Sequence, residues 1–104
     1  MKLLVITSLK EYQKTVSDIL YKSGINVFSV TETIGFKDHQ QVNLLDNWFS
    51  RGGDQFDSIF IFSFTSEDKA HSVVEQVKGY NENNDTGFPI RAFVLTVDQS
   101  SYTN

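Results

Sequence analysis

The fold is decided by the stretch Ser58-Ile59-Phe60-Ile61-Phe62-Ser63-Phe64. Isoleucine and phenylalanine are enriched in strands, and no glycine or proline interrupts them, so the stretch predicts a strand over residues 58–64. Successive side chains of a strand point to opposite faces, which places the three phenylalanines on one face and the two isoleucines on the other. Both faces are therefore apolar. A layer of helices covers only one of them, so something else has to cover the second.

The sequence before this stretch predicts a strand, a helix and another strand. Residues 2–6 are rich in leucine and β-branched residues and predict the first strand. Ser8 and Glu11 form a capping box, which predicts that a helix begins at Ser8. Gly24 predicts its end, because a residue without a Cβ readily takes the left-handed conformation that stops a helix. Residues 27–34 predict the second strand.

The sequence after it predicts a helix and a last strand. Thr65 or Ser66 is suited to cap a helix with a stripe of alanine and valine, and residues 90–97 predict the last strand. The predicted order is strand, helix, strand, strand, helix, strand. This is the ferredoxin-like α+β fold, a four-stranded antiparallel sheet with two helices on one face. A length of 104 residues predicts a single domain, residues 1–104.

The strands predicted at residues 2–6 and 90–97 are also apolar on both faces. We therefore expect the face without helices to be buried by self-association. The alternative is that a long loop or the C-terminal tail folds across it.

The link between the second and third strands, residues 37–57, is far longer than a hairpin loop needs. It is either a short helix packed on its own sheet or a mobile arm whose apolar residues dock on a partner. The helix-like spacing of four apolar residues suits both interpretations: Val42, Leu45, Trp48 and Phe49.

Composition excludes several classes of function. A net charge of −4 with scattered basic residues argues against nucleic-acid binding. The absence of cysteine excludes disulfides and thiolate metal sites. No apolar run is long enough to span a bilayer, so we expect a cytoplasmic protein without direct membrane insertion. No catalytic motif is present, and we expect no enzyme activity. We expect no metal site. His39 beside Asp38 is the one candidate ligand, and the alternative is that both are solvated polar residues.

Three segments resemble the PII family of nitrogen-regulatory signalling proteins. The segment 29–36, S-V-T-E-T-I-G-F, resembles the family's T-V-T-E-V-K-G-F-G before its long loop. The segment 21–25, Y-K-S-G-I, is similar to the family's A-E-x-G-I helix end. Thr86-Gly87 followed by residues 91–97, R-A-F-V-L-T-V, is similar to T-G…G-K-I-F-V-L-P-V, with Phe88-Pro89-Ile90 in place of the G-D-G turn. The resemblance covers nearly the whole chain.

The resemblance implies a homotrimer with an effector site in each cleft between subunits, usually for an adenine nucleotide. It also implies that the loop 37–57 contacts a target protein, a transporter or an enzyme. That loop contains no tyrosine, so uridylylation is not expected. Glycine lets backbone amides approach a phosphate, and arginine holds an anion through two hydrogen bonds. Carried over by position, the effector site would be lined by Ser29, Gly35, Phe36, Lys37, Phe64, Gly87 and Arg91.

Two other functions stay open from the sequence. One is a metal-binding trimer similar to the divalent-cation tolerance proteins, which share this fold. The other is a monomeric RNA-recognition module, because the phenylalanines at 60, 62 and 64 could stack bases and residues 91–94 echo an RNA-binding motif. Oligomeric state separates the monomeric RNA-recognition module from the PII-like regulator and the metal-binding protein, which are both trimers.

Overall fold

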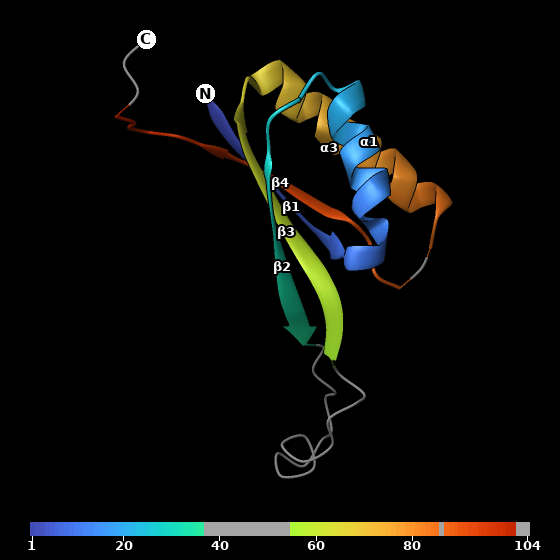
Figure 1. Cartoon of the computed structure of the whole chain (residues 1–104). Coiled ribbons are helices and arrows are strands. Elements are labelled where there is room, and N and C mark those ends of the chain that lie inside the picture. The colour runs from blue at the N-terminus through green and yellow to red at the C-terminus, as the bar shows by residue number, and fades with distance from the viewer. Residues whose placement is uncertain (37–54, 86, 102–104) are drawn as a thin grey trace.

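The computed structural model describes residues 1–36, 55–85 and 87–101 (Figure 1). The predictions for Lys37, His39, Val42, Leu45, Trp48 and Phe49 lie outside these residues. The elements in chain order are β1 (Lys2–Leu9), the 3-10 helix η1 (Lys10–Tyr12), α1 (Gln13–Lys22), β2 (Ser29–Phe36), β3 (Gln55–Thr65), α3 (Glu67–Asn83) and β4 (Arg91–Thr96).

The four strands form one antiparallel sheet in the order β2-β3-β1-β4. Both helices lie on the same face of this sheet, and the ends of β2 and β3 project beyond them (Figure 1). The predicted α+β, ferredoxin-like arrangement is thereby confirmed. The prediction for β2, residues 27–34, lies two residues before the observed strand. The prediction for β3, residues 58–64, begins three residues after the observed start. Pairing between the two strands in fact continues to Phe36 and Gln55.

The core lies between the sheet and the helices. Leu4 and Ile6 of β1 and Ile59 and Ile61 of β3 point toward the helices and are almost fully buried. Burying one such aliphatic side chain stabilises the fold by about 1.5–3 kcal/mol. The helices and the connecting segments complete this core with Val16, Ile19, Leu20, Ile25, Val73, Val77 and Ile90.

The start of the first helix differs from the prediction. Ser8 caps no helix: it lies in β1, is buried, and its hydroxyl donates to the Leu9 carbonyl at 2.9 Å. The helix α1 begins five residues later at Gln13, and no side chain caps it. The capping-box prediction is wrong because β1 goes on pairing with β3 through Ser8 and Leu9. Hydrogen bonds of the sheet outweigh the local alternative.

The end of α1 and the start of α3 agree with the sequence. Gly24 has φ 83°, the Gly24 amide donates to Tyr21, and the Ile25 amide donates to Leu20. This is a Schellman ending, as the glycine predicts. At the start of α3, the Ser66 hydroxyl accepts a hydrogen bond from the Lys69 amide at 3.4 Å, which confirms the predicted cap.

The face of the sheet opposite the helices, here called the open face, carries a row of apolar side chains. Phe60, Phe64, Phe93 and Leu95 are between 36% and 58% exposed there. Register explains the row, because β1 lies between β3 and β4 and Val5 pairs with a phenylalanine on each side. In the described part of the chain, no element covers this face. No described helix is long and apolar enough to cross a bilayer.

Candidate functional site

Four of the predicted effector residues line one cleft. Gly35 and Phe36 at the end of β2, Gly87 in the α3–β4 loop and Arg91 at the start of β4 surround a space of about 390 Å³. A volume of this size lies within the range of small-molecule sites. The remaining lining residues come from the end of β1, the start of β3 and the same loop: Thr7, Ser8, Leu9, Phe56, Ser58, Phe88 and Pro89.

Two predicted effector residues, Ser29 and Phe64, lie outside this cleft. Ser29 is the first residue of β2 and pairs with Phe62, whereas Gly35 lies six residues further along the same strand, about 20 Å away. Phe64 pairs with Leu3 and lines a different hollow, formed with the two ends of the described chain. A single subunit therefore does not bring all of these residues together.

Gly35 contacts an aromatic ring. It pairs with Phe56 across the β2–β3 ladder, and a Cβ at Gly35 would lie 2.2 Å from Cε2 and 2.3 Å from Cζ of that ring. The Cδ2 atom would be only 2.9 Å away, so the Cβ would sit over the ring face rather than beside its edge. The ring of Phe56 thus covers the bare backbone of an edge-strand glycine, which compensates for the missing side chain.

Phe56 also contacts the loop on the other side of the cleft. Its ring and that of Phe88 meet edge to face, with centroids 5.1 Å apart and planes at 63°. Such pairs contribute roughly 0.5–1.5 kcal/mol beyond the apolar area that they bury. This contact joins the end of the β2–β3 pair that lies next to residues 37–54 to the α3–β4 loop.

The α3–β4 loop is fixed near its C-terminal end. The Asn81 side chain of α3 accepts a hydrogen bond from the Ile90 amide at 3.1 Å and donates one to the Ile90 carbonyl at 2.7 Å. Ile90 is 1% exposed, so both backbone groups would otherwise be buried without these partners. Gly87 has φ 79°, a conformation that favours glycine, and among the described residues no atom outside its chain neighbours lies within 4 Å of its Cβ position. Asn81 therefore sets the position of Arg91, which follows Ile90.

Arg91 supplies the positive charge of the cleft. It pairs with Thr7 in the β1–β4 ladder, and both side chains belong to the open face. It is exposed, and no described residue forms an ion pair with it. Arg91 is the one charged side chain among the described residues that line the cleft. The site thus combines one guanidinium with hydroxyls and three phenylalanines.

A charged pair lies just outside the cleft. Lys10 of η1 and Glu32 of β2 form an ion pair on the surface. The hydrogen bond to Glu32 and the attraction of its charge raise the pKa of Lys10 above 10.5. This pair joins the middle of β2 to the segment after β1.

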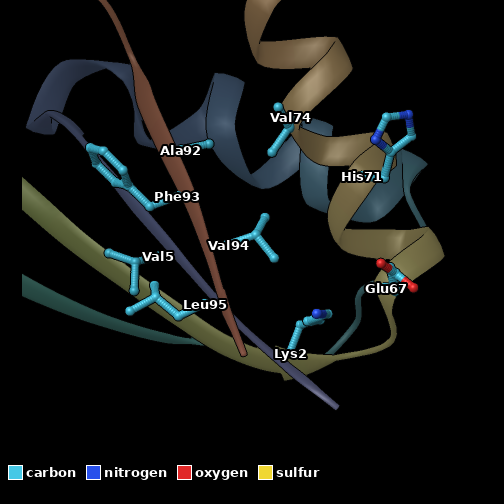
Figure 2. Close-up of a pocket in the computed structure, with 9 residues that line it drawn as sticks. All are labelled: Lys2, Val5, Glu67, His71, Val74, Ala92, Phe93, Val94 and Leu95. Atoms are coloured by element: carbon cyan, nitrogen blue, oxygen red, sulfur yellow. The ribbon is translucent and has the colours of Figure 1, made fainter. Parts of the chain in front are cut away.

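A larger hollow, of about 800 Å³, lies along the β4 edge of the sheet and is lined by residues of β1, β4 and α3. Figure 2 shows Val94 on the side of β4 that faces α3, whereas Phe93 and Leu95 point to the opposite side. Lys2 also lines this hollow, and its ammonium group donates a hydrogen bond to the Thr96 hydroxyl at 2.9 Å. None of the predicted effector residues lines this hollow. The described residues also contain no group of three or more His, Asp or Glu side chains placed to hold a metal ion.

Sequence reasoning missed Phe56, Phe88, Thr7 and Asn81 in the site. The register between β2 and β3 brings Phe56 to Gly35, and that register could be found only by knowing where the long link ends. In the sequence, nothing distinguishes Asn81 from other polar residues near the end of a helix. Its contact with Ile90 could not be predicted, because it depends on the path of the loop between them.

The sequence matches no protein-family model and no curated protein sequence. The fold does match solved structures. One is a protein from Thermus thermophilus described as a PII-like signalling protein, with a TM-score of 0.58 and 16% identity over 89% of this chain and 82% of that chain. Another is CPII, a nitrogen regulatory PII-like protein from Thiomonas intermedia, bound to ADP, AMP and bicarbonate. It gives a TM-score of 0.61 and 13% identity over 95% of this chain and 93% of that chain. The resemblance in the sequence and the solved structures agree that this chain has the fold of the PII-like signalling proteins.

Proposed function

We propose that this chain is a PII-like regulator, a homotrimer that binds an adenine nucleotide in clefts between subunits. It contacts a target protein, a transporter or an enzyme, through residues 37–57, and its role is signalling rather than catalysis. One observation carries the proposal. Gly35, Phe36, Gly87 and Arg91, chosen from the sequence alone and distant along the chain, line one cleft of the size that a small ligand needs.

The chemistry of the cleft supports an anionic ligand with an apolar part. Arg91 can hold a phosphate through two hydrogen bonds, and no acidic side chain among the described lining residues opposes it. The phenylalanines suit a purine ring. The structural neighbour CPII carries ADP and AMP, and this supports an adenine nucleotide as the effector.

The open face and the split site both support the trimer. Ser29 and Phe64 lie at the opposite end of the sheet from Gly35, so a site that contains all three needs residues from two copies of the chain. The exposed phenylalanines of the open face supply the apolar contact area. Fully burying each such side chain would favour association by about 1.5–3 kcal/mol before the costs of ordering are subtracted.

The identity of the effector can be tested by measuring the Tm of the protein with ADP, AMP or bicarbonate, each added alone. A ligand present at one hundred times its Kd stabilises the folded state by about 2.7 kcal/mol, which raises the Tm of a domain of this size by roughly ten degrees or more. Arg91→Ala should lose the response to the nucleotides. Lys22→Ala removes another exposed positive charge, at the end of α1, and should keep this response. A wild-type Tm that ADP and AMP leave unchanged would refute nucleotide binding.

Light scattering after gel filtration examines the trimer. The wild type should have three times the mass of one chain. Phe60→Asp places a charge on the open face and should give monomers. Val27→Asp changes a more exposed apolar residue, 83% exposed and outside the sheet, and should leave the mass unchanged. A monomeric wild type would refute the trimer and leave the aromatic face exposed, as the RNA-recognition alternative requires.

Replacing Trp48 and Phe49 together by serine examines the proposed target-binding loop. If these residues serve a partner, the free energy of unfolding of the isolated protein should change by less than about 0.5 kcal/mol. A loss of several kcal/mol would instead place both side chains in the core.

A further inference from the structure

We propose that Asp98 of one copy forms an ion pair with Arg91 of the next copy in the trimer, and that this carboxylate competes with an anionic ligand for Arg91. The inference rests on the proposed function and adds to it a contact of the C-terminal segment that regulates the cleft. Its experiments separate a failure of the ion pair from a failure of the trimer or of nucleotide binding.

Arg91 and Asp98 are charged side chains without a partner in the described part of the chain. Both are exposed, and neither takes part in a contact with another described residue that would neutralise it. Ion pairs between described residues join Lys10 with Glu32, Lys14 with Asp18, and Lys78 with Glu75. Arg91 and Asp98 thus offer opposite charges that a second copy of the chain can pair.

The two charges cannot meet within one chain. Arg91 is the first residue of β4, and Asp98 follows its last residue, Thr96, by two positions. A strand rises about 3.3 Å per residue, so β4 alone holds Arg91 and Thr96 about 17 Å apart. Beyond β4 the chain runs away from the sheet, at the end opposite to the projecting ends of β2 and β3 (Figure 1). A pair between these side chains therefore has to join two copies.

The proposed trimer brings the end that carries Asp98 to the cleft of the next copy. Phe64 is predicted to belong to the effector site, and it can meet Gly35 only from another copy. Phe64 lines a hollow of about 720 Å³ together with Val97 and Gln99, which flank Asp98 in the chain. The contact that brings Phe64 to the neighbouring cleft therefore brings Asp98 as well.

Position singles out Asp98 among the acidic groups at that end of the molecule. Glu67 and Asp68 begin α3, so they belong to the helix side of the sheet. Phe64 and Arg91 belong to the open face, which the trimer buries. Arg91 is also the one charged group among the described residues of the cleft. A carboxylate that arrives beside Phe64 therefore meets this single positive charge.

A closed ring of three copies uses each charge once. Each copy offers Arg91 to one neighbour and Asp98 to the other, so three identical contacts form and close the ring. The contact also affects the ligand, because a guanidinium that a carboxylate holds through two hydrogen bonds cannot hold a phosphate in the same way. An anionic ligand has to displace Asp98. Binding in the cleft thus releases the C-terminal segment of the neighbouring copy.

Cross-linking tests the contact directly, because the natural chain contains no cysteine. Arg91→Cys and Asp98→Cys are introduced together, and the protein is treated with a short bis-maleimide. We expect covalent dimers and trimers on a denaturing gel. Each single variant alone should give neither, and the two single variants refolded together should stop at dimers. Arg91→Cys with Asp68→Cys is the matched control and should give no covalent trimer, because the second thiol lies on the helix side.

Exchanging the two charges tests their attraction. Arg91→Asp alone and Asp98→Arg alone each place like charges at all three contacts. An exposed ion pair changes an equilibrium by a factor of about two to five, so three contacts should lower the association constant of the trimer roughly ten- to a hundredfold. The double variant, with the charges exchanged, should assemble like the wild type. Sedimentation equilibrium measures this constant for each protein.

Calorimetric titration with AMP tests the competition for Arg91. Asp98→Asn keeps the size of the side chain and removes its charge, so AMP should bind about two- to fivefold more tightly than to the wild type. Asp68→Asn removes an exposed carboxylate from the same end of the molecule and should bind AMP as the wild type does.

The ion pair and the trimer can fail separately. A trimeric double-cysteine protein without covalent trimers would refute the pair and leave the trimer intact, as would a double charge variant that assembles no better than the single variants. Equal AMP affinity of the wild type and Asp98→Asn would refute the competition. If the wild type is monomeric, the proposed trimer fails, and the pair fails with it. If AMP binds to none of these proteins, the effector proposal and the competition fail, and the cross-links still decide the contact.

Discussion

Replacing Gly35 by alanine tests whether the Phe56 ring rather than open space fills the position of a side chain. The new Cβ would lie 2.2 Å from Cε2 and 2.3 Å from Cζ of Phe56, whereas carbon atoms in contact prefer about 3.5–4.0 Å. The ring therefore has to move by more than about 1 Å. Phe88 contacts the same ring at 5.1 Å between centroids, so the movement disturbs the α3–β4 loop as well.

We expect this substitution to lower the free energy of unfolding by about 2 kcal/mol, within the usual 1–3 kcal/mol for overpacking. At roughly 4–8 °C per kcal/mol, the Tm should fall by about 10 °C, and by less if the subunits unfold together. Urea unfolding followed by circular dichroism measures the free energy directly.

Gly79→Ala is the matched control. Gly79 lies in α3, and apart from its chain neighbours and the helix's own backbone no atom of the described residues lies within 4 Å of its Cβ position. Alanine there should raise the free energy of unfolding by roughly 0.5–1 kcal/mol, because it restricts the unfolded chain and favours the helix. In a Phe56→Ala background, Gly35→Ala should cost nothing. If Gly35→Ala is as stable as the wild type while Phe56 is present, the packing argument is wrong.

Two further predictions concern residues around the cleft. Asn81→Ala should lower the free energy of unfolding by about 1–3 kcal/mol, because it leaves the buried backbone groups of Ile90 without partners. In the same urea titration Asn83→Ala, which removes one exposed bond, should change it by less than about 0.5 kcal/mol, and equal losses would contradict the assigned role of Asn81. The raised pKa of Lys10 makes its pairing with Glu32 stabilising below pH 10.5, and this stabilisation is lost as the pH rises through the folded-state value. Unfolding followed from about pH 9 to about pH 12 should therefore show a steeper loss in the wild type than in Glu32→Gln, and parallel curves would contradict the pairing.

The strands were the most predictable part of the fold. The alternation of Ile59, Phe60 and Ile61 is a property of the chain itself, and it correctly separated the buried face from the open face. Gly24 was equally clear, because only a left-handed residue completes the Schellman ending. Ser8 misled because its local pattern suits a helix start, whereas long-range pairing with β3 decides its conformation.

The site was predictable in part. Gly35, Gly87 and Arg91 were placed by resemblance, and the fold brings them to one cleft. The physical role assigned to Gly35 was different: the sequence suggests room for a phosphate, whereas a ring occupies that side of the glycine. From the sequence, Phe88 could be recognised only as part of the segment that stands in place of the family's G-D-G turn. Its contact with Phe56 depends on two segments that approach each other in space.

The paired contacts between Asn81 and Ile90 have a consequence for hydrogen exchange. Ile90 precedes β4, so its amide has no partner in the sheet ladder, yet it is buried and bonded to a side chain of α3. Its exchange with solvent then requires opening of the helix–loop contact instead of fraying of the strand. The slow exchange of this single amide would therefore report, without any ligand, how often the loop that carries Phe88 detaches from the helix.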